Sequence, residues 1–312
     1  MNRFRTVDVH QHFWPRTLIE ALRARGAPPR LRGWTLELAG EPDSVVDPRW
    51  HDADGRAELA RADGLDLALV SLSSPLGIEL LAPAEAGELL DAYHDGALTL
   101  PEPFSAWAAA CLTDVDPGAL SRELGRGFVG LQLPATALLD GAGYDHAGPL
   151  LELLEDAGLP LMVHPGPITG GAAGDQPAWW PAMVAYVQQM HAAWFAFRAH
   201  GRSRHPRLRV CFAMLGGLAP LHGERFAARA GERGVVDPDV FLDVSSYGTR
   251  AIDATVRVVG IDALVNGSDR PYAEPMSLEL GPAALHAIRG ANAMRLLYPK
   301  EVFDDLAIAA PA

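Results

Sequence analysis

The chain has 312 residues, of which 49% are hydrophobic and 21% charged, and its formal net charge at pH 7 is −13. This composition is typical of a globular protein with a large core, and the acidic balance argues against a nucleic-acid partner, because phosphate binding requires a basic surface. We expect no signal peptide and no contact with a membrane, because no apolar run approaches the ~18 residues of a membrane span. Cys111 and Cys211 lie in apolar runs, so we expect reduced thiols and a cytoplasmic protein.

Short apolar runs alternate with helical patterns along the chain. The runs expected to form strands are residues 6–12, 67–71, 106–112, 128–133, 159–164, 208–213, 240–244 and 263–266. Helices are expected at residues 17–25, 55–63, 84–99, 117–124, 148–157, 219–233, 250–259, 282–289 and 291–297. A further helix is expected within residues 166–204 and ends near residue 200. Strands that alternate with helices indicate an α/β protein with a parallel sheet, and eight repeats favour a distorted (β/α)8 TIM barrel over an open doubly wound sheet.

Two segments interrupt this alternation. Residues 27–53, which follow the first strand and helix, are rich in Pro, Gly and Trp and predict an inserted loop with a small β element near residues 35–39. Residues 166–204, which follow the fifth strand, combine a Gly-rich loop with a helix. The sequence shows neither an internal repeat nor a linker, so we expect one domain over residues 1–312.

Metal-compatible side chains stand at the ends of three predicted strands. His10 and His12 are two residues apart on the first strand and therefore point to the same side. His164 ends the fifth strand and Asp269 follows the eighth. Because a (β/α)8 barrel places its active site at the C-terminal ends of its strands, these four side chains are expected to converge on one divalent metal. Imidazoles with a carboxylate suit zinc, manganese, iron or cobalt, and zinc is the preferred metal.

Five motifs carry a resemblance to a known family. VDVHQHFWP, LMVHPGP, CFAMLGGLAP, VNGSDRPY and IRGANAMRLL occur in this order over residues 7–297. In them the chain resembles the amidohydrolase superfamily, specifically the branch that includes aminocarboxymuconate-semialdehyde decarboxylase and the resorcylate-type decarboxylases. The resemblance implies a distorted barrel with one catalytic metal, commonly zinc and sometimes manganese, and suggests a homodimer. It makes His10, His12, His164 and Asp269 metal ligands, and Asp269 also a proton carrier.

The sequence departs from the family at the end of the sixth strand, where Met214 stands in place of a histidine that assists proton transfer. A thioether has no titratable proton, although it can fill space and contact an apolar substrate. The exchange removes a general base, which typically contributes about 10²–10⁴-fold to a rate, without removing the metal ligands. His222, Tyr247 and Asp269 are the candidates to compensate, and Asp269 is the preferred one.

Further residues are candidates for contact with a substrate. Arg270 could hold a substrate carboxylate or pair with Glu274. Arg49 could approach the site from the first insertion, and Tyr247 could face it or pack in the core. The pair Trp179–Trp180 could line a pocket for a flat substrate or contact a partner subunit.

Other polar residues are expected to be structural or exposed. Asp8 faces the same way as His10, one step deeper, and is expected to be a buried structural carboxylate. The histidines of helices and loops are expected at the surface: His51, His94, His146, His191, His200, His205 and His286.

The preferred function is that of a metal-dependent enzyme that decarboxylates a small aromatic or unsaturated carboxylic acid. Decarboxylation can use Asp269 as the proton carrier, whereas hydrolysis depends more on a base for water. The first alternative is a hydrolase of an ester, lactone or amide with Asp269 as base. The second is a catalytically weakened barrel that binds a ligand or a partner, for which Met214 is the argument.

Overall fold

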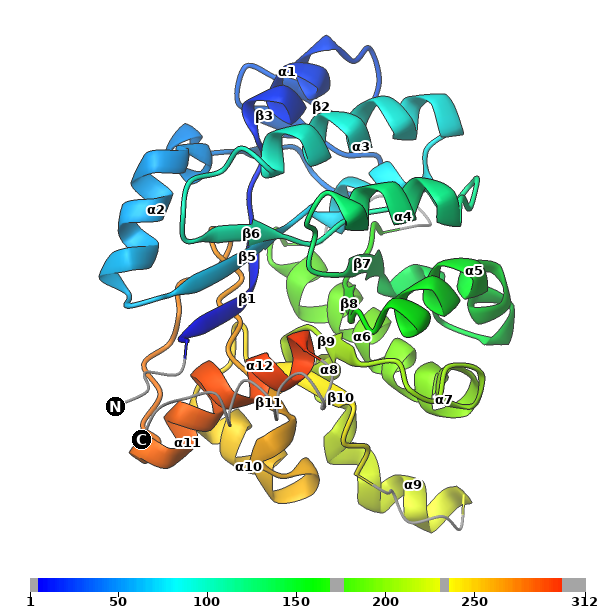
Figure 1. Ribbon diagram of the computed structural model, residues 1–312, viewed down its shortest axis with the longest axis vertical. Helices are drawn as coiled ribbons and strands as arrows, with labels where there is room; N and C mark the ends of the chain where they lie inside the picture. The colour runs from blue at the N-terminus through cyan, green and yellow to red at the C-terminus, as the bar shows by residue number, and fades with distance from the viewer. Residues whose placement is uncertain (1–4, 169–176, 231–235, 299–312) are drawn as a thin grey trace.

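The computed structural model describes residues 5–168, 177–230 and 236–298 (Figure 1). Its parallel strands form two sheets, one in the order β1-β5-β6 and one in the order β11-β10-β9-β8-β7. The strands are β1 (Val7–His12), β5 (Leu67–Ser71), β6 (Phe104–Ala106), β7 (Leu131–Pro134), β8 (Leu161–His164), β9 (Val210–Phe212), β10 (Val240–Asp243) and β11 (Leu264–Val265). Seven of the eight predicted strands are present, most of them shorter than expected, whereas the third was placed wrongly: β6 ends at Ala106, where the strand expected at 106–112 was to begin.

Backbone hydrogen bonds join the two sheets at both edges. Between β6 and β7, Ala108 N donates to Gly130 O at 2.9 Å, and Gln132 N donates to Ala108 O at 2.8 Å. Between β11 and β1, Val9 N donates to Asn266 O at 2.8 Å. These bonds complete a ring of strands that is irregular at its two seams, which is the distorted barrel that the sequence predicts.

Helices surround the strands (Figure 1). They are α1 (Arg16–Ala24), α2 (Ala53–Ala62), α3 (Pro83–Ala97), α4 (Pro117–Gly125), α5 (Gly141–Ala157), α6 (Tyr186–Ala196), α7 (Arg202–Arg204), α8 (Met214–Gly217), α9 (Gly223–Ala230), α10 (Thr249–Val259), α11 (Pro282–His286) and α12 (Asn292–Leu297). The helix expected at 148–157 begins earlier, at Gly141, because Asp140 caps it by accepting a hydrogen bond from Gly143 N. The last residues of the helix expected at 219–233 lie outside the described part of the chain.

Both insertions lie where the sequence places them. The first contains the small antiparallel sheet β2 (Arg30–Arg32), β3 (Thr35–Glu37) and β4 (Ser44–Val45), which confirms the expected β element. In the second, one π-helical turn leads into α6 and another joins α6 to α7. Part of its Gly-rich loop, residues 169–176, is outside the described residues.

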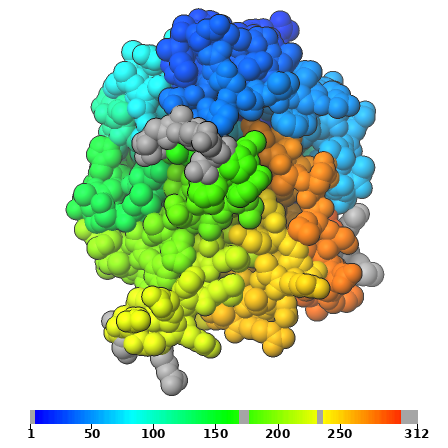
Figure 2. Space-filling view, turned by 180° about the vertical axis from the view of Figure 1, so that it is seen from behind, coloured from blue at the N-terminus to red at the C-terminus, as the bar shows by residue number. Residues whose placement is uncertain are grey.

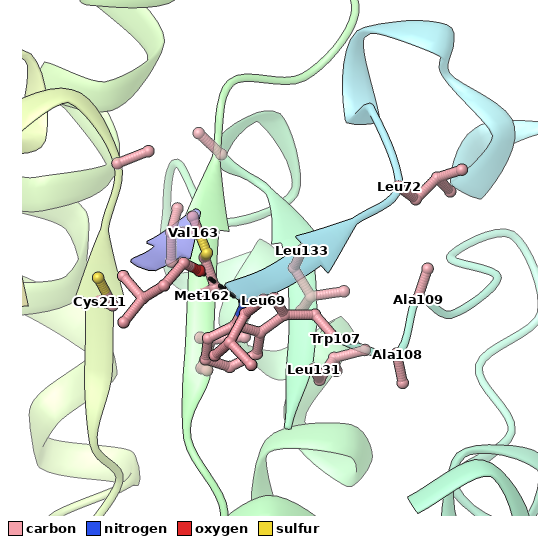
Figure 3. Packing of buried hydrophobic residues seen from close by; sticks show 14 of the residues in the cluster. Leu69, Leu72, Trp107, Ala108, Ala109, Leu131, Leu133, Met162, Val163 and Cys211 are labelled. Atoms are coloured by element: carbon pink, nitrogen blue, oxygen red, sulfur yellow. Dashed lines mark hydrogen bonds between the residues drawn. The ribbon is translucent and has the colours of Figure 1, made fainter. Parts of the chain in front are cut away.

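The core fills the barrel and the space beneath its helices. Trp107 is fully buried, and its indole Nε1 donates to Val9 O at 2.9 Å. Figure 3 shows Trp107 among Leu69, Leu131 and Met162, so that side chains from several strands meet in the interior. Both cysteines are free thiols, Cys211 buried and Cys111 partly buried. Among the described residues, no helix is long and apolar enough to cross a membrane.

Candidate metal centre

The three predicted histidines and the predicted aspartate converge at the C-terminal ends of β1, β8 and β11. His12 Nε2 lies 3.1 Å from both His10 Nε2 and His164 Nε2. Asp269 Oδ1 lies 3.5 Å from His10 Nε2 and 3.3 Å from His12 Nε2. These ligand atoms all lie within 4.8 Å of one another, so the group could hold one metal ion.

The outer nitrogens of the rings show that the inner nitrogens are free to bind a cation. His164 Nδ1 is 2.9 Å from Pro165 O, and His12 Nδ1 is 3.2 Å from Ser71 Oγ. Protons assigned to these Nδ1 atoms leave lone pairs on the Nε2 atoms, which is the tautomer that metal ligation requires. Two lone pairs that face each other at 3.1 Å repel unless a cation lies between them. The donor set therefore fits a divalent metal.

Asp243, at the end of β10, orients His10. Its Oδ2 accepts from His10 Nδ1 at 2.7 Å, and its Oδ1 accepts from Ser245 N at 2.9 Å and from Met214 N at 3.1 Å. Burial alone raises the pKa of Asp243, but His10 and the hydrogen bonds lower it below its ordinary value, so the carboxylate stays ionised. Burial lowers the pKa of His10, but the charge and hydrogen bond of Asp243 together with the charges of Asp269 and Asp8 outweigh burial and raise the pKa to about 9.

Asp243 was not predicted as part of the site, because the strand expected at 240–244 places it before the end of an otherwise apolar run. The signal was present, since Asp243 ends its strand as His164 ends β8. A polar residue in the last position of a barrel strand faces the mouth of the barrel.

Asp8 is a buried structural carboxylate, as predicted. It accepts hydrogen bonds from His10 N at 3.1 Å, Ser268 N at 3.1 Å and Gln11 Nε2 at 2.8 Å. Gln11 Oε1 in turn accepts from the buried Arg56 at 2.6 Å. Because Ser268 precedes Asp269, this network fixes the first strand against the loop that carries the fourth ligand.

Two strand ends at the site have left-handed backbone. Asp269 has φ +61°, and Met214 has φ +55°. Residues 214–218 all have positive φ, so α8 is a left-handed turn and not a regular helix. For non-glycine residues this conformation costs roughly 1–2 kcal/mol each, and such strain tends to collect at functional sites.

The side chains near the turn differ in exposure. Met214 and Tyr247 are both partly buried against the core. Burial raises the pKa of Tyr247, which therefore keeps its phenol proton at neutral pH. His222 is exposed, and its ring packs at 4.9 Å from that of His191. Among the described residues, no contact joins His222 to the four candidate ligand side chains.

The two candidate arginines are engaged in ion pairs. The side chain of Arg270 is 11% exposed and lies 3.2 Å from both Asp63 and Glu274, so the alternative of a salt bridge is the one observed. Arg49 is 87% exposed and pairs with Asp47 at 2.6 Å. Neither guanidinium is placed by these contacts to bind a substrate carboxylate.

The tryptophan pair lies before α6 at the surface. Trp179 is 57% exposed, and its ring centroid is 5.9 Å from that of Trp180. Exposed aromatic rings fit either alternative, a pocket wall or a contact with a partner subunit.

The surface expectation is wrong for His94 and His205, which are buried, and His51, His191 and His200 are partly buried. His94 is buried, and its Nε2 accepts from Ala109 N at 3.1 Å. His205 is also buried. His51 is partly buried, accepts from Trp14 N and stacks on the Trp14 ring at 4.5 Å. Helical spacing alone does not show which histidine faces a neighbouring element.

Tyr272, which lies beside His12, and a hydrogen-bonded pair between the two insertions, Tyr186 and Glu41, were not foreseen. The Tyr272 ring lies 5.3 Å from that of His12, and its hydroxyl is 3.2 Å from Ser73 Oγ. Tyr186, at the start of α6, donates from its hydroxyl to Glu41 Oε1 at 2.5 Å. Tyr272 follows the predicted Asp269 by three positions, so the sequence could have indicated that it lies near the site. Glu41 and Tyr186 lie in two separate insertions, and no sequence signal indicates that they meet.

Comparison with solved structures gives close matches in fold. IDCase of Metarhizium anisopliae matches with a TM-score of 0.75 and 20% identity, over 94% of this chain and 97% of that one. The 2,6-dihydroxybenzoate decarboxylase of Rhizobium matches with a TM-score of 0.68 and 20% identity, over 95% and 99%. The 5-carboxyvanillate decarboxylase of Novosphingobium aromaticivorans, solved with manganese and a nitrobenzoic acid, matches with a TM-score of 0.70 and 17% identity, over 94% and 96%.

No protein-family model matches the sequence, and a search of curated proteins gives no match. At identities of 20% and below, the structural likeness establishes the fold. The chain therefore shares the fold of these solved decarboxylases, which agrees with the barrel expected from the sequence motifs.

Proposed function

We propose that the chain is a metal-dependent decarboxylase of a small aromatic or unsaturated carboxylic acid. The observation that carries the proposal is the convergence of His10, His12, His164 and Asp269, with every outer ring nitrogen engaged by an acceptor. The fold supports it, because solved proteins of the same fold include decarboxylases of aromatic acids, one of them with bound manganese.

The four side chains would hold the metal, which when bound grips the carboxylate of the substrate or a neighbouring oxygen. Decarboxylation breaks the bond between the carboxyl carbon and the substrate carbon, releases CO₂, and leaves that substrate carbon to take up a proton. Burial raises the pKa of Asp269, but its hydrogen bond to His12 and the nearby histidines lower it below its ordinary value. Asp269 is therefore ionised; it would take up a proton from solvent and donate it to the substrate carbon, which keeps the electron pair of the broken bond when CO₂ leaves.

Met214 fits this reaction better than hydrolysis. Its thioether offers no proton and no base, and it is partly buried beside the core. A hydrolase of an ester, lactone or amide would have to rely on Asp269 alone to activate water. A weakened barrel that only binds a ligand would keep the metal and show no turnover.

Further properties follow from the proposal. We expect zinc or manganese as the metal, since three imidazoles and a carboxylate suit both. We also expect a single domain over residues 1–312, a small-molecule substrate, a homodimer and a cytoplasmic location. No contact with nucleic acid or membrane is expected.

The test combines metal content with CO₂ release. We expect about one metal per chain in protein purified without chelator and loss of that metal in His12→Ala. A panel of hydroxybenzoic and unsaturated acids should then show CO₂ release from at least one member. Release of an acid with an alcohol or amine would select the hydrolase, and full metal content without turnover would select the binding barrel. A protein that stays free of metal after addition of zinc or manganese would contradict the proposal.

A further inference from the structure

A cavity lies outside the metal centre, between α6, α9 and α10. Its volume is about 510 Å³, which is within the range of pockets that bind small molecules. Four aromatic side chains line it: Trp194, Phe195, Phe197 and Phe226. Figure 2 shows α9 (yellow) at the lower edge of the molecule, next to α10 (gold). The cavity therefore has the size and the apolar walls of a ligand-binding site.

The cavity and the metal centre lie at opposite ends of β10. Val240, the first residue of the strand, lines the cavity, whereas Asp243, the last residue, accepts from His10 Nδ1. Likewise Ala263, just before β11, lines the cavity, and Asp269 follows that strand. At a rise of ~3.3 Å per residue, the two ends of β10 are about 10 Å apart. The cavity is therefore separate from the metal centre.

Packing against the barrel and between helices holds the aromatic walls in place. Trp194 and Phe197 pack edge-on against the buried Phe212 of β9, with ring centroids 5.4 Å and 5.9 Å from that of Phe212. Phe195 stacks on Phe226 of α9, with 6.0 Å between their ring centroids. Because the rings already have fixed partners, a ligand that enters between them loses little free energy in ordering them.

The mouth of the cavity exposes apolar side chains. Val236 and Val258 line the cavity and are 52% and 43% exposed. Gly223, at the start of α9, adds open space, because a Cβ atom there would meet only Val258 Cγ1, at 3.8 Å. An apolar ligand would remove this surface from water, which favours the bound state.

Arg198 adds a positive charge to this apolar cavity. Its guanidinium carbon lies 4.6 Å from the centroid of the Phe226 ring, and this cation–π contact holds the side chain at the cavity. Within the part of the chain that the structure describes, no carboxylate forms an ion pair with Arg198. Its N–H groups can therefore donate to an anionic ligand in the paired geometry that a carboxylate accepts.

The other charges at the cavity neutralise each other. Arg202 Nε donates to Asp237 Oδ2 at 2.6 Å, and Arg202 Nη2 donates to Asp237 Oδ1 at 3.3 Å. The remaining nitrogen of Arg202 donates to three backbone carbonyls. Arg198 thus supplies the one charge that these contacts leave uncompensated. A single guanidinium suits a monoanion such as a carboxylate better than a phosphate dianion.

The inner wall of the cavity also supports the left-handed turn at residues 214–218. A Cβ atom on Gly216 would lie 3.4 Å from Trp194 Cε3, so the indole packs directly against the turn. At the start of the same turn, Met214 N donates to Asp243, which orients His10. The cavity and the metal centre are thus separate places that share one structural support.

We propose that this cavity is a second binding site, which takes a small carboxylic acid with an apolar body. The carboxylate pairs with Arg198, and the aryl or alkyl part enters between the aromatic walls. The proposal goes beyond the proposed function and does not depend on it, because the cavity and the metal centre have no lining residue in common.

The test is calorimetric binding of three probes to the manganese-loaded full-length protein. 4-Phenylbutyrate carries both the apolar body and the carboxylate, 4-phenylbutyramide lacks the charge, and acetate lacks the body. We expect 4-phenylbutyrate to bind wild type at least about threefold more tightly than the amide, a modest factor because Arg198 is exposed and its ion pair is screened. It should bind at least about tenfold more tightly than acetate, because the phenyl group and its chain bury apolar surface.

Two variants and two matched controls assign the binding to the cavity. Arg198→Gln should bring the affinities of the acid and the amide to within about twofold of each other. Val258→Trp fills the mouth opposite Gly223 and should weaken 4-phenylbutyrate binding at least about tenfold. Arg225→Gln, at an exposed position on α9, and Val45→Trp, at a 79% exposed position on β4, change residues outside the cavity and should bind as wild type does. All four variants should keep their manganese and the wild-type circular dichroism spectrum.

Three results would contradict the proposal. Wild type that shows no saturable binding of 4-phenylbutyrate would mean that the cavity takes no such acid. Binding that is unchanged in both Arg198→Gln and Val258→Trp but is lost on removal of manganese would assign the probe to the metal centre. A dimer in sedimentation analysis that Val258→Trp dissociates would show that a second copy of the chain covers the cavity. None of these results contradicts the proposed decarboxylase, which depends on the metal centre alone.

Discussion

The end of β1 and the end of β9 lie on the same barrel and differ in what their side chains offer. β1 supplies His10 and His12, whose ring nitrogens meet the other ligands on one side and acceptors on the other. β9 leads to Met214, which offers no proton and no ligand suited to a hard divalent metal. Yet the backbone of Met214 donates to Asp243, the same carboxylate that orients His10.

The difference shows that Met214, although its side chain offers neither proton nor base, is held in the same hydrogen-bonded framework as His10. Asp243 joins the two strand ends, and the left-handed turn at 214–218 keeps its strained geometry. A site that had lost all constraint would have no reason to keep that strain. The alternative explanation for the left-handed turn is that it serves packing alone. Substitutions in the turn and at Asp243 test which of the two explanations holds.

The largest effect is expected from Gly217→Ala in that turn. Gly217 has φ +60°, and a Cβ atom there would lie 2.6 Å from Val187 O in α6. Strained backbone and a contact with backbone that cannot move aside should reduce the free energy of unfolding by about 2–3 kcal/mol. Denaturant unfolding measures this change.

Gly87→Ala is the matched control for this prediction. Gly87 lies in α3, and an added Cβ would meet nothing within 4 Å. The same change there should be neutral or stabilising by up to about 1 kcal/mol, because alanine favours a helix. Equal stability of the two variants would show that the turn is not constrained as described.

The next effect is expected from Asp243→Ala, which removes the residue shared by both strand ends. Without the acceptor for Nδ1, the His10 ring loses its orientation and its fixed tautomer, so metal affinity should fall about 10- to 100-fold. Competition with a chelator indicator measures the affinity. Ser245→Ala removes another hydrogen bond to Asp243 but spares the one to His10, and should cost less. An unchanged metal affinity in Asp243→Ala would show that Asp243 does not link the ends of β1 and β9 functionally.

The smallest effect on metal content, and the most informative one for chemistry, is expected from Met214→His. Metal content should stay within about twofold of wild type, because the four ligands are unchanged. The new imidazole acts as a base only when neutral, so kcat/KM should gain a limb that rises with pH through about 6.5. Met214→Leu should show no such limb. A large gain in bound metal in Met214→His would mean that the wild-type ligand set is incomplete.

The sequence was sufficient for the elements and ligands that local patterns encode. Alternating apolar runs and helical patterns predict seven of the eight barrel strands, because a parallel sheet buried on both faces leaves continuous apolar runs. The third strand, β6, ends at Ala106, and the apolar run after it was mistaken for the strand. The H-x-H spacing and the polar residues at strand ends predict the four ligands, since strand geometry alone directs them to one edge. Helix α5 shows the limit, because its Gly-rich first turn depends on the cap by Asp140.

Only the tertiary structure decided which distant residues support the site. In the sequence Asp243 is part of an apolar strand, and only the fold shows that its Oδ2 lies 2.7 Å from His10 Nδ1. The sequence allows Arg270 either to bind a substrate carboxylate or to form a salt bridge, and its contacts with Asp63 and Glu274 show the salt bridge. Glu41 and Tyr186 are 145 positions apart and have no shared motif. Periodicity records which side of an element faces inward, whereas hydrogen bonds between distant segments depend on how whole elements pack, which no local pattern records.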